Sequence, residues 1–151
     1  MKRRSFVQTS SGASVLALAA LAGWSPAQAQ TAWNKGAFEG KNLAEVVKAL
    51  GGTAIESKDI ILQAPEIAEN GNVVRIGAQS NLPNTTSLAL IVEKNPAALA
   101  AVFDVYPGTD ANMSTNVKMG QSSNVFAVAK AGDKFYYAVK EVKVTLGGCG
   151  G

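Results

Sequence analysis

The chain has 151 residues, of which 14 are Lys or Arg and 11 are Asp or Glu, and it contains no histidine. Histidine is the commonest metal ligand and the commonest general base at neutral pH, so its absence argues against an active site built by this chain alone. Three basic residues and no acidic ones fall in the first 29 positions, which leaves 11 basic and 11 acidic residues in the rest. With net charge near zero and few aromatic side chains, the chain does not have the surface of a nucleic-acid-binding protein.

The first 29 residues have the three regions of a secretory signal peptide. Residues 1–4 are basic, residues 12–23 are apolar and rich in alanine, and residues 27–29 form an Ala-x-Ala cleavage site. The apolar run is too short to span a bilayer, so we expect cleavage after Ala29 rather than a retained membrane anchor. Residues 3–7 resemble a twin-arginine signal, which exports folded proteins. We therefore expect a periplasmic protein with one domain, residues 30–146, and a short tail, residues 147–151.

The mature chain begins with a polar stretch and a short helix. Residues 30–40 are polar apart from two aromatic residues, and we expect them to form an extended arm packed on the domain. A helix is predicted for residues 43–50, with Asn42 as its N-cap and Gly51 and Gly52 at its end. Its apolar residues recur at helical spacing, at Leu43, Val46, Val47 and Leu50. This is the one helix that the sequence predicts.

From residue 58 onwards the sequence is typical of β-structure. Apolar and polar residues alternate in short runs that are separated by Gly, Pro, Asn and Asp. Strands are expected at residues 58–64, 74–78, 88–92, 99–106, 114–119, 125–129 and 135–146. Between the first two, Asn70 and Gly71 predict a turn with the positive φ angles of a tight hairpin. About seven short strands with turns between them predict a mainly β fold, an antiparallel sandwich of the immunoglobulin-like type.

The last strand contains a change of parity. Phe135, Tyr137 and Val139 occupy odd positions, whereas the apolar residues that follow occupy even ones, at Val142, Val144 and Leu146. A regular strand with one buried face keeps its apolar residues two apart. We therefore predict a β-bulge or a change of sheet at residues 140–141.

The chain ends in Gly147-Gly148-Cys149-Gly150-Gly151, with its only cysteine in the middle. Such a thiol cannot belong to a core, and no second cysteine exists to pair with it. Glycines lack β-carbons, so the arm is slim and flexible and can enter a narrow channel in a partner. A thiolate is strongly nucleophilic and forms S–S bonds that can be cleaved or exchanged. No Lys or Arg follows Lys143 to activate the thiol, so we expect a covalent carrier that partner enzymes act on, not an enzyme.

Three other interpretations of the tail are open at this stage. It is a glycine-rich end without function, or its thiol cross-links two copies of a structural sandwich protein, or it supplies a soft ligand for copper(I) together with Met113 and Met119. The two methionines have the spacing of ordinary strand residues, which favours packing over a metal site. Lipidation through a C-terminal CaaX box does not fit, because only two residues follow the cysteine.

Four stretches carry a resemblance to a known family. They are residues 65–71 (PEIAENG), 94–96 (KNP), 124–129 (NVFAVA) and 142–151 (VKVTLGGCGG). All four resemble the SoxY family, the sulfur-carrying subunits of the thiosulfate-oxidising Sox system. The resemblance implies a carrier with no cofactor, metal or catalytic residue of its own. It also implies that Cys149 is the point of covalent sulfur attachment, and that Gly147, Gly148, Gly150 and Gly151 form the flexible arm.

The resemblance also implies a set of partners. SoxY forms a heterodimer with SoxZ, a smaller β-sandwich protein without a cysteine arm. The haem protein SoxXA joins thiosulfate oxidatively to the thiol, and the manganese enzyme SoxB then hydrolyses off sulfate. Where SoxCD is present, it oxidises the remaining sulfane. A disulfide-linked dimer of the carrier is a further expected form.

Overall fold

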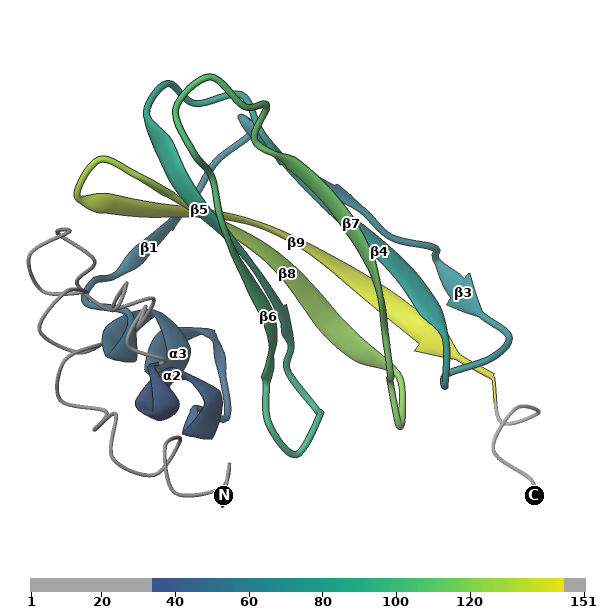
Figure 1. Cartoon of the computed structure of the whole chain (residues 1–151). Coiled ribbons are helices and arrows are strands. Elements are labelled where there is room, and N and C mark those ends of the chain that lie inside the picture. The colour runs from purple at the N-terminus through teal and green to yellow at the C-terminus, as the bar shows by residue number, and fades with distance from the viewer. Residues whose placement is uncertain (1–33, 146–151) are drawn as a thin grey trace, which may run out of the picture. The chain divides into compact units, whose positions relative to one another are not determined.

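Two β-sheets and two short helices make up residues 34–145, the part of the chain that the computed structural model describes (Figure 1). The larger sheet has the strand order β1-β9-β8-β5-β6, with β3 also paired to β9, and the smaller sheet has the order β2-β4-β7. The elements are α2 (Lys35–Glu39), α3 (Leu43–Ala49), β1 (Ala54–Glu56), β2 (Ile60–Gln63), β3 (Ile67–Ala68), β4 (Val74–Ser80), β5 (Thr85–Val92), β6 (Leu99–Asp104), β7 (Asn112–Val117), β8 (Ser123–Ala131) and β9 (Lys134–Val144). The predicted signal peptide and its cleavage site lie outside the described residues. Within residues 34–145, no helix is long and apolar enough to cross a bilayer.

The prediction of a single helix was wrong, because α2 occupies part of the stretch that was expected to be extended. The side chain of Asn34 accepts a hydrogen bond from Ala37 N at 3.1 Å and donates one to Ala49 O at 2.7 Å. Asn34 therefore caps α2 and also ties it to the end of α3. The predicted helix α3 is confirmed, with the Asn42 side chain accepting from Glu45 N at 2.9 Å. A five-residue helix is too short to be stable alone, so packing on the sheet stabilises α2.

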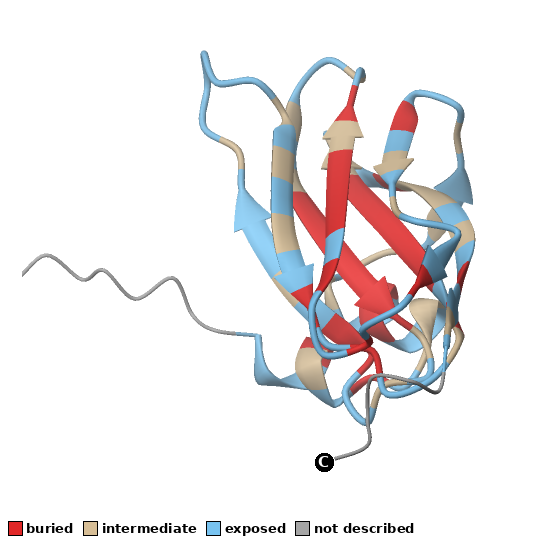
Figure 2. Cartoon of the chain, turned by 90° about the vertical axis from the view of Figure 1, so that its right-hand side faces the viewer, coloured by how far each residue is buried: buried red, intermediate tan, exposed pale blue. Residues whose placement is uncertain are grey.

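The larger sheet is covered on both faces over part of its area. Its inner face packs against the smaller sheet, and the buried residues follow the central strands (Figure 2). Its outer face is covered by α2 and α3. The cluster between the sheets includes Ile76, Leu88, Leu90, Val92, Met119, Val125 and Val142. The cluster under the helices includes Val46, Val47, Ile91, Phe126, Val128 and Phe135.

Strand β9 is regular and stays in the larger sheet, so the prediction of a β-bulge or a change of sheet at residues 140–141 was wrong. It pairs with β8 without a shift of register over the whole paired length. The parity of its apolar residues changes because the face that is covered changes along the strand. Phe135 and Tyr137 pack under the helices. The residues that pack toward the smaller sheet are Tyr136, Ala138, Val142 and Val144.

The mainly β, immunoglobulin-like sandwich that the sequence predicts is confirmed, and each expected strand is present with its ends shifted by a few residues. The main ladders, β2–β4, β4–β7, β5–β6, β5–β8 and β8–β9, are antiparallel. Two very short strands, β1 and β3, were not predicted. Both pair in parallel with β9, one after the other along the same edge.

A turn follows β3 as predicted, but it does not form a hairpin. Val73 N donates to Asn70 O at 3.2 Å, which closes the turn. Strand β3 before the turn pairs with β9, whereas β4 after it pairs with β2 and β7. Gly71 is not among the described glycines with positive φ, which are Gly51, Gly108 and Gly132. The Asn70-Gly71 pair therefore predicted the position of the turn correctly, although Gly71 does not supply the positive φ angle on which the prediction was based.

Candidate functional site

The sulfur site predicted from the sequence lies beyond the described residues. Cys149 and the glycines around it, Gly147, Gly148, Gly150 and Gly151, follow Thr145, which is the last residue described. The structure does describe residues 143–145, from which the arm starts, and we call these residues the arm base. Cys149 stands four residues beyond Thr145, and an extended chain advances about 3.3–3.6 Å per residue. The thiol can therefore reach points within roughly 14 Å of the arm base.

One edge of the arm base is hydrogen-bonded to the segment around β3. Lys143 N donates to Glu66 O at 2.9 Å, and Thr145 N donates to Ala68 O at 3.1 Å. These bonds belong to the parallel pairing of β3 with the end of β9. The segment is the PEIAENG stretch on which part of the family resemblance rests. Its backbone thus holds the chain up to Thr145, the last described residue.

The other edge of the arm base is held by a side chain. The pairing of β8 with β9 ends at Ser123, opposite Val142. One step further on, the Ser122 side-chain oxygen accepts a hydrogen bond from Val144 N at 2.9 Å. The serine satisfies a backbone N–H that the sheet leaves without a carbonyl partner. The arm base is therefore hydrogen-bonded along both of its edges.

Gly71 allows two loops to close over the arm base. Met119 N donates to Gly71 O at 2.6 Å, which joins the loop after β7 to the loop after β3. A β-carbon on residue 71 would overlap the carbonyl oxygen of Met119 and lie 2.9 Å from Cγ1 of Val144. Only glycine fits here without displacing backbone. The close approach explains why glycine follows Asn70.

A lysine links the middle of β9 to the start of the same segment. Lys140 Nζ donates to Ala64 O at 3.0 Å and lies 3.9 Å from Glu66 Oε1. The carboxylate is largely exposed, so the ion pair contributes little, and the hydrogen bond to the backbone is the stronger contact. Glu141 and Lys143 line the same shallow hollow beside β3. The surface next to the arm base therefore carries both signs of charge.

The two methionines considered as copper ligands pack in the core. Met119 is fully buried between the sheets, and Met113 is partly buried against the same cluster. These positions favour the packing interpretation. Residues 34–145 contain no group of three or more Asp, Glu, His or Cys side chains that could hold a metal ion.

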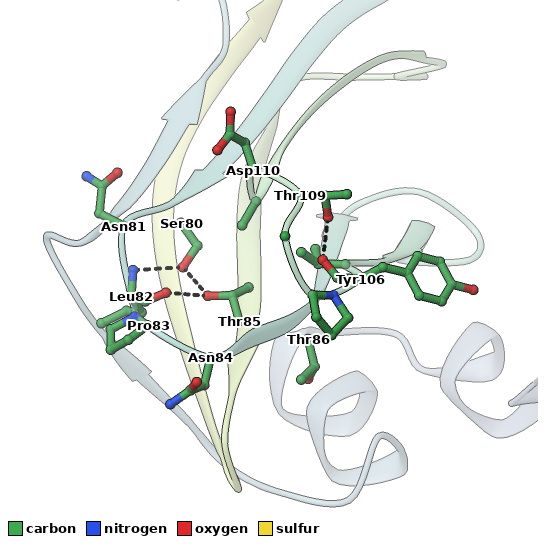
Figure 3. A pocket seen from close by; sticks show the side chains of 14 residues that line it. Ser80, Asn81, Leu82, Pro83, Asn84, Thr85, Thr86, Tyr106, Thr109 and Asp110 are labelled. Atoms are coloured by element: carbon green, nitrogen blue, oxygen red, sulfur yellow. Dashed lines mark hydrogen bonds between the residues drawn. The ribbon is translucent and has the colours of Figure 1, made fainter.

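A pocket of about 620 Å³ lies at the end of the sandwich opposite the arm base (Figure 3). The β4–β5 and β6–β7 loops form it, and its Thr85 pairs with Ala131, next to the start of β9. Its hydroxyl groups bond within the pocket: Ser80 Oγ lies 2.8 Å from Thr85 Oγ1, and Thr109 Oγ1 donates to Tyr106 O at 2.6 Å. Strand β9 has 11 residues, or about 35 Å, so the arm of the same chain cannot reach this pocket.

An immunoglobulin-like sandwich that fixes the base of a glycine arm, with the only cysteine of the sequence in that arm, has the features of a carrier class of protein. The model of the family described as sulfur oxidation protein SoxY matches residues 46–149, a range that includes Cys149. The chain belongs to the SoxY family.

Comparison with solved structures agrees with this assignment. The sulfur carrier protein SoxY from Chlorobium limicola f thiosulfatophilum is 38% identical and has a TM-score of 0.57, over 62% of this chain and 84% of that one. A superoxide reductase (neelaredoxin) from Ignicoccus hospitalis is 18% identical with a TM-score of 0.51, over 57% of this chain and 79% of that one, which shows a shared fold only. A comparison with curated proteins found no match. The family and the similar carrier structure support a sulfur-carrier role for this chain.

Sequence reasoning predicted the arm but did not predict the contacts that hold its base. Ser122 and Lys140 carried no signal, since a serine in a loop and a lysine in a strand are ordinary. Gly71 did carry one, because glycine is favoured both where φ is positive and where backbone approaches closely, and the structure shows the second reason.

Proposed function

We propose that this chain is a periplasmic carrier that binds sulfur intermediates of thiosulfate oxidation covalently on Cys149 and presents them to the Sox enzymes. One observation carries the proposal: the only cysteine stands in a glycine arm, within the family match, beyond a base that is hydrogen-bonded on both edges. A fixed base and a slim end suit a thiol that has to enter other proteins. The chain contributes the attachment point and the partners contribute the catalysis.

The proposed loading step is an oxidation. The Cys149 thiol and thiosulfate form a protein S-thiosulfonate, R–S–S–SO₃⁻, as the thiol releases one proton and the pair loses two electrons to the haem protein SoxXA. Hydrolysis then adds water across the terminal S–S bond. This step releases sulfate and two protons and leaves a persulfide, R–S–S⁻, on Cys149. SoxB, a manganese enzyme, would carry out this hydrolysis, and SoxCD, where it is present, would oxidise the remaining sulfane.

The proposed resting form is a heterodimer with SoxZ, a β-sandwich subunit without a cysteine arm. Such a partner must leave the arm base uncovered, because the enzymes have to approach within the roughly 14 Å that the thiol can reach. Any receiving enzyme therefore contacts the loops around Gly71 and Ser122. The signal peptide that the sequence predicts supports a periplasmic location for this exchange.

The first test is intact-mass spectrometry of the protein isolated without reductant from cells that are consuming thiosulfate. We expect sulfur, sulfonate or thiosulfonate adducts on the peptide that contains Cys149, and we expect reductant to remove them. A free thiol, or only a homodimeric disulfide, in cells that consume thiosulfate would contradict the proposal and favour a structural protein cross-linked through Cys149.

The second test uses Cys149→Ser in a reconstituted system with the partner proteins. The substitution lies outside the sandwich, so we expect an unchanged unfolding curve and complete loss of thiosulfate-dependent electron transfer. Activity equal to that of the unchanged protein would rule out covalent carriage on Cys149.

A further inference from the structure

The outer face of the smaller sheet has a gap in its middle. Gln63 of β2 pairs with Gly77 of β4, and Gly77 pairs with Ser114 of β7, so the three residues form one row across the sheet. The neighbours of Gly77 on β4, Ile76 and Ala78, are buried between the sheets, so this row faces outward. Because glycine has no side chain, the row is empty between Gln63 and Ser114. A hollow of about 220 Å³ lies at this place.

Arg75 lines the same hollow. It stands two residues before Gly77 on β4 and therefore faces the same side of the sheet. Both ion pairs within residues 34–145 are made by lysines, so the guanidinium of Arg75 has no carboxylate partner in that part of the chain. The side chains of Gln63 and Ser114 also have no hydrogen-bond partner among the described residues. Three side chains with unused hydrogen-bond donors therefore surround one gap.

The charges around the hollow favour a negative ligand. Strands β2, β4 and β7 contain no aspartate or glutamate, and Arg75 is their only charged residue. Ala64 and Pro65 complete the lining, and the Ala64 carbonyl oxygen is already bonded to Lys140 Nζ at 3.0 Å. Glu66, which follows Pro65, lies 3.9 Å from the same ammonium group and lines the separate hollow beside β3. The residues that line the gap thus carry one positive charge and no negative one.

We propose that this hollow binds the –SO₃⁻ end of a sulfur oxyanion. A planar guanidinium donates two parallel hydrogen bonds to two oxygens of such a group. The Gln63 amide and the Ser114 hydroxyl, one on each side of the gap, can donate to the remaining oxygen. Gly77 leaves the room, because a β-carbon there would lie 3.2 Å from Gln63 Oε1 and 3.3 Å from the Met113 carbonyl oxygen.

This chemical group can reach the hollow from two sources. One is free thiosulfate or sulfate, and the other, which rests on the proposed function, is the S-thiosulfonate on Cys149. Pro65 lies three residues before Ala68, or about 10 Å along the chain, and Ala68 is hydrogen-bonded to Thr145 of the arm base. The thiol reaches roughly 14 Å from the arm base, so a loaded arm can place its sulfonate at Arg75. The hollow is open to solvent, so binding is weak, in the millimolar range, and the ligand is released readily.

The first test is a heteronuclear magnetic resonance titration of the mature chain with Cys149→Ser. Arg75 is the only arginine after residue 29, so its Nε–H signal identifies itself. Sodium thiosulfate, sulfate and acetate are added at constant ionic strength. We expect saturable shifts of the Arg75, Gly77 and Ser114 signals with thiosulfate and sulfate, and smaller shifts with the planar carboxylate of acetate.

Substitutions then show whether the named residues form the site. Arg75→Gln should raise the half-saturation concentration about fivefold or more, and Arg75→Lys, which keeps the charge but loses the paired donors, about two- to threefold. Gly77→Ala should weaken binding because a methyl group fills the gap. The matched control is Lys134→Gln, the same change of charge at the start of β9, which should leave the titration unchanged. Far-ultraviolet circular dichroism checks that each variant is folded.

The second test loads the unchanged thiol chemically, without any partner protein. The Cys149 thiolate attacks tetrathionate and forms R–S–S–SO₃⁻, and the free thiosulfate that leaves is removed by gel filtration. The neutral control is the same thiol capped with a carbamidomethyl group. A sulfonate held by the hollow should shift the Arg75 and Gly77 signals as the free ion does, whereas the capped protein should not show these shifts, and a reductant should reverse them.

The two tests separate the sources and expose the proposal to failure. Shifts in the loaded protein assign the hollow to the arm, and shifts with free ions alone assign it to thiosulfate or sulfate in solution. No saturable shift from either source, equal shifts with acetate, or an unchanged titration in Arg75→Gln would overturn the proposal. Because the loading needs no enzyme, such a failure leaves the proposed carrier function standing, and an absence of adducts in cells would leave the oxyanion site standing.

Discussion

Gly71→Ala tests the claim that two loops close over the arm base because residue 71 has no side chain. The new methyl group would overlap the Met119 carbonyl oxygen and lie 2.9 Å from Cγ1 of Val144, so backbone has to move. Overpacking of this kind costs about 1–3 kcal/mol, and loss of the Met119 N to Gly71 O hydrogen bond costs about 1 kcal/mol more. We expect the free energy of unfolding to fall by about 2–4 kcal/mol in total.

Urea unfolding of the mature chain measures this loss, and a thermal scan should show a melting temperature lower by roughly 8–16 °C. Gly120→Ala is the matched control, because it lies in the same loop as Met119, has no positive φ, and its β-carbon would meet nothing within 4 Å. The control should change the free energy of unfolding by less than about 0.5 kcal/mol. Equal stabilities of the two variants would refute the close-approach argument.

Three further predictions concern the arm base, the arm and the helices. Ser122→Ala removes the acceptor of the Val144 N–H, so the free energy of unfolding should fall by about 1 kcal/mol. The Val144 amide should also exchange faster with deuterium. Unchanged exchange at Val144 would contradict the role of Ser122. Gly148→Val should leave the Cys149 thiol titratable by a small reagent but slow its processing by partner enzymes, because a branched side chain widens and stiffens the arm; an equal fall in both rates would contradict this. Asn42→Ala removes the N-cap of α3 and should lower the unfolding free energy by about 1 kcal/mol in urea, whereas Asn116→Ala, at an exposed position of β7, serves as the comparison.

Strand β2 and strands β4 to β9 were predictable because each carries its own pattern of apolar residues and turns, whereas β1 and β3 are too short to show one. Helix α3 was predictable for the same reason, since Asn42 caps it and Val46 and Val47 share one face. Helix α2 was not, because five residues do not show a helical period. What stabilises α2 is tertiary: Ala37 is fully buried, and Asn34 bonds to the end of α3. These contacts depend on the fold and cannot be predicted from the residues of α2 alone.

The parity of β9 shows a different limit of sequence reasoning. The pattern was read correctly, but alternation alone does not tell which layer covers which part of a strand. Phe135 and Tyr137 belong to the layer of helices, whereas Val142 belongs to the layer between the sheets. In the site, the prediction of Cys149 rests on the sequence, in which it is the only cysteine. The hydrogen bonds of its base involve segments far from the end of β9 in sequence, at Ser122 and Ala68, and only the fold brings them together.

Strand β9 is flanked along both edges, by β8 on one side and by β1 and then β3 on the other. This arrangement determines how the protein responds to mechanical load. A pull on Cys149 acts along the axis of β9. The hydrogen bonds from β9 to its neighbouring strands lie roughly perpendicular to that axis, so many of them bear the force at the same time. A strand at a free edge, pulled sideways, would instead open one bond at a time. In the proposed carrier role, the arm therefore follows a strand that is hydrogen-bonded on both sides and resists being drawn out when Cys149 is pulled.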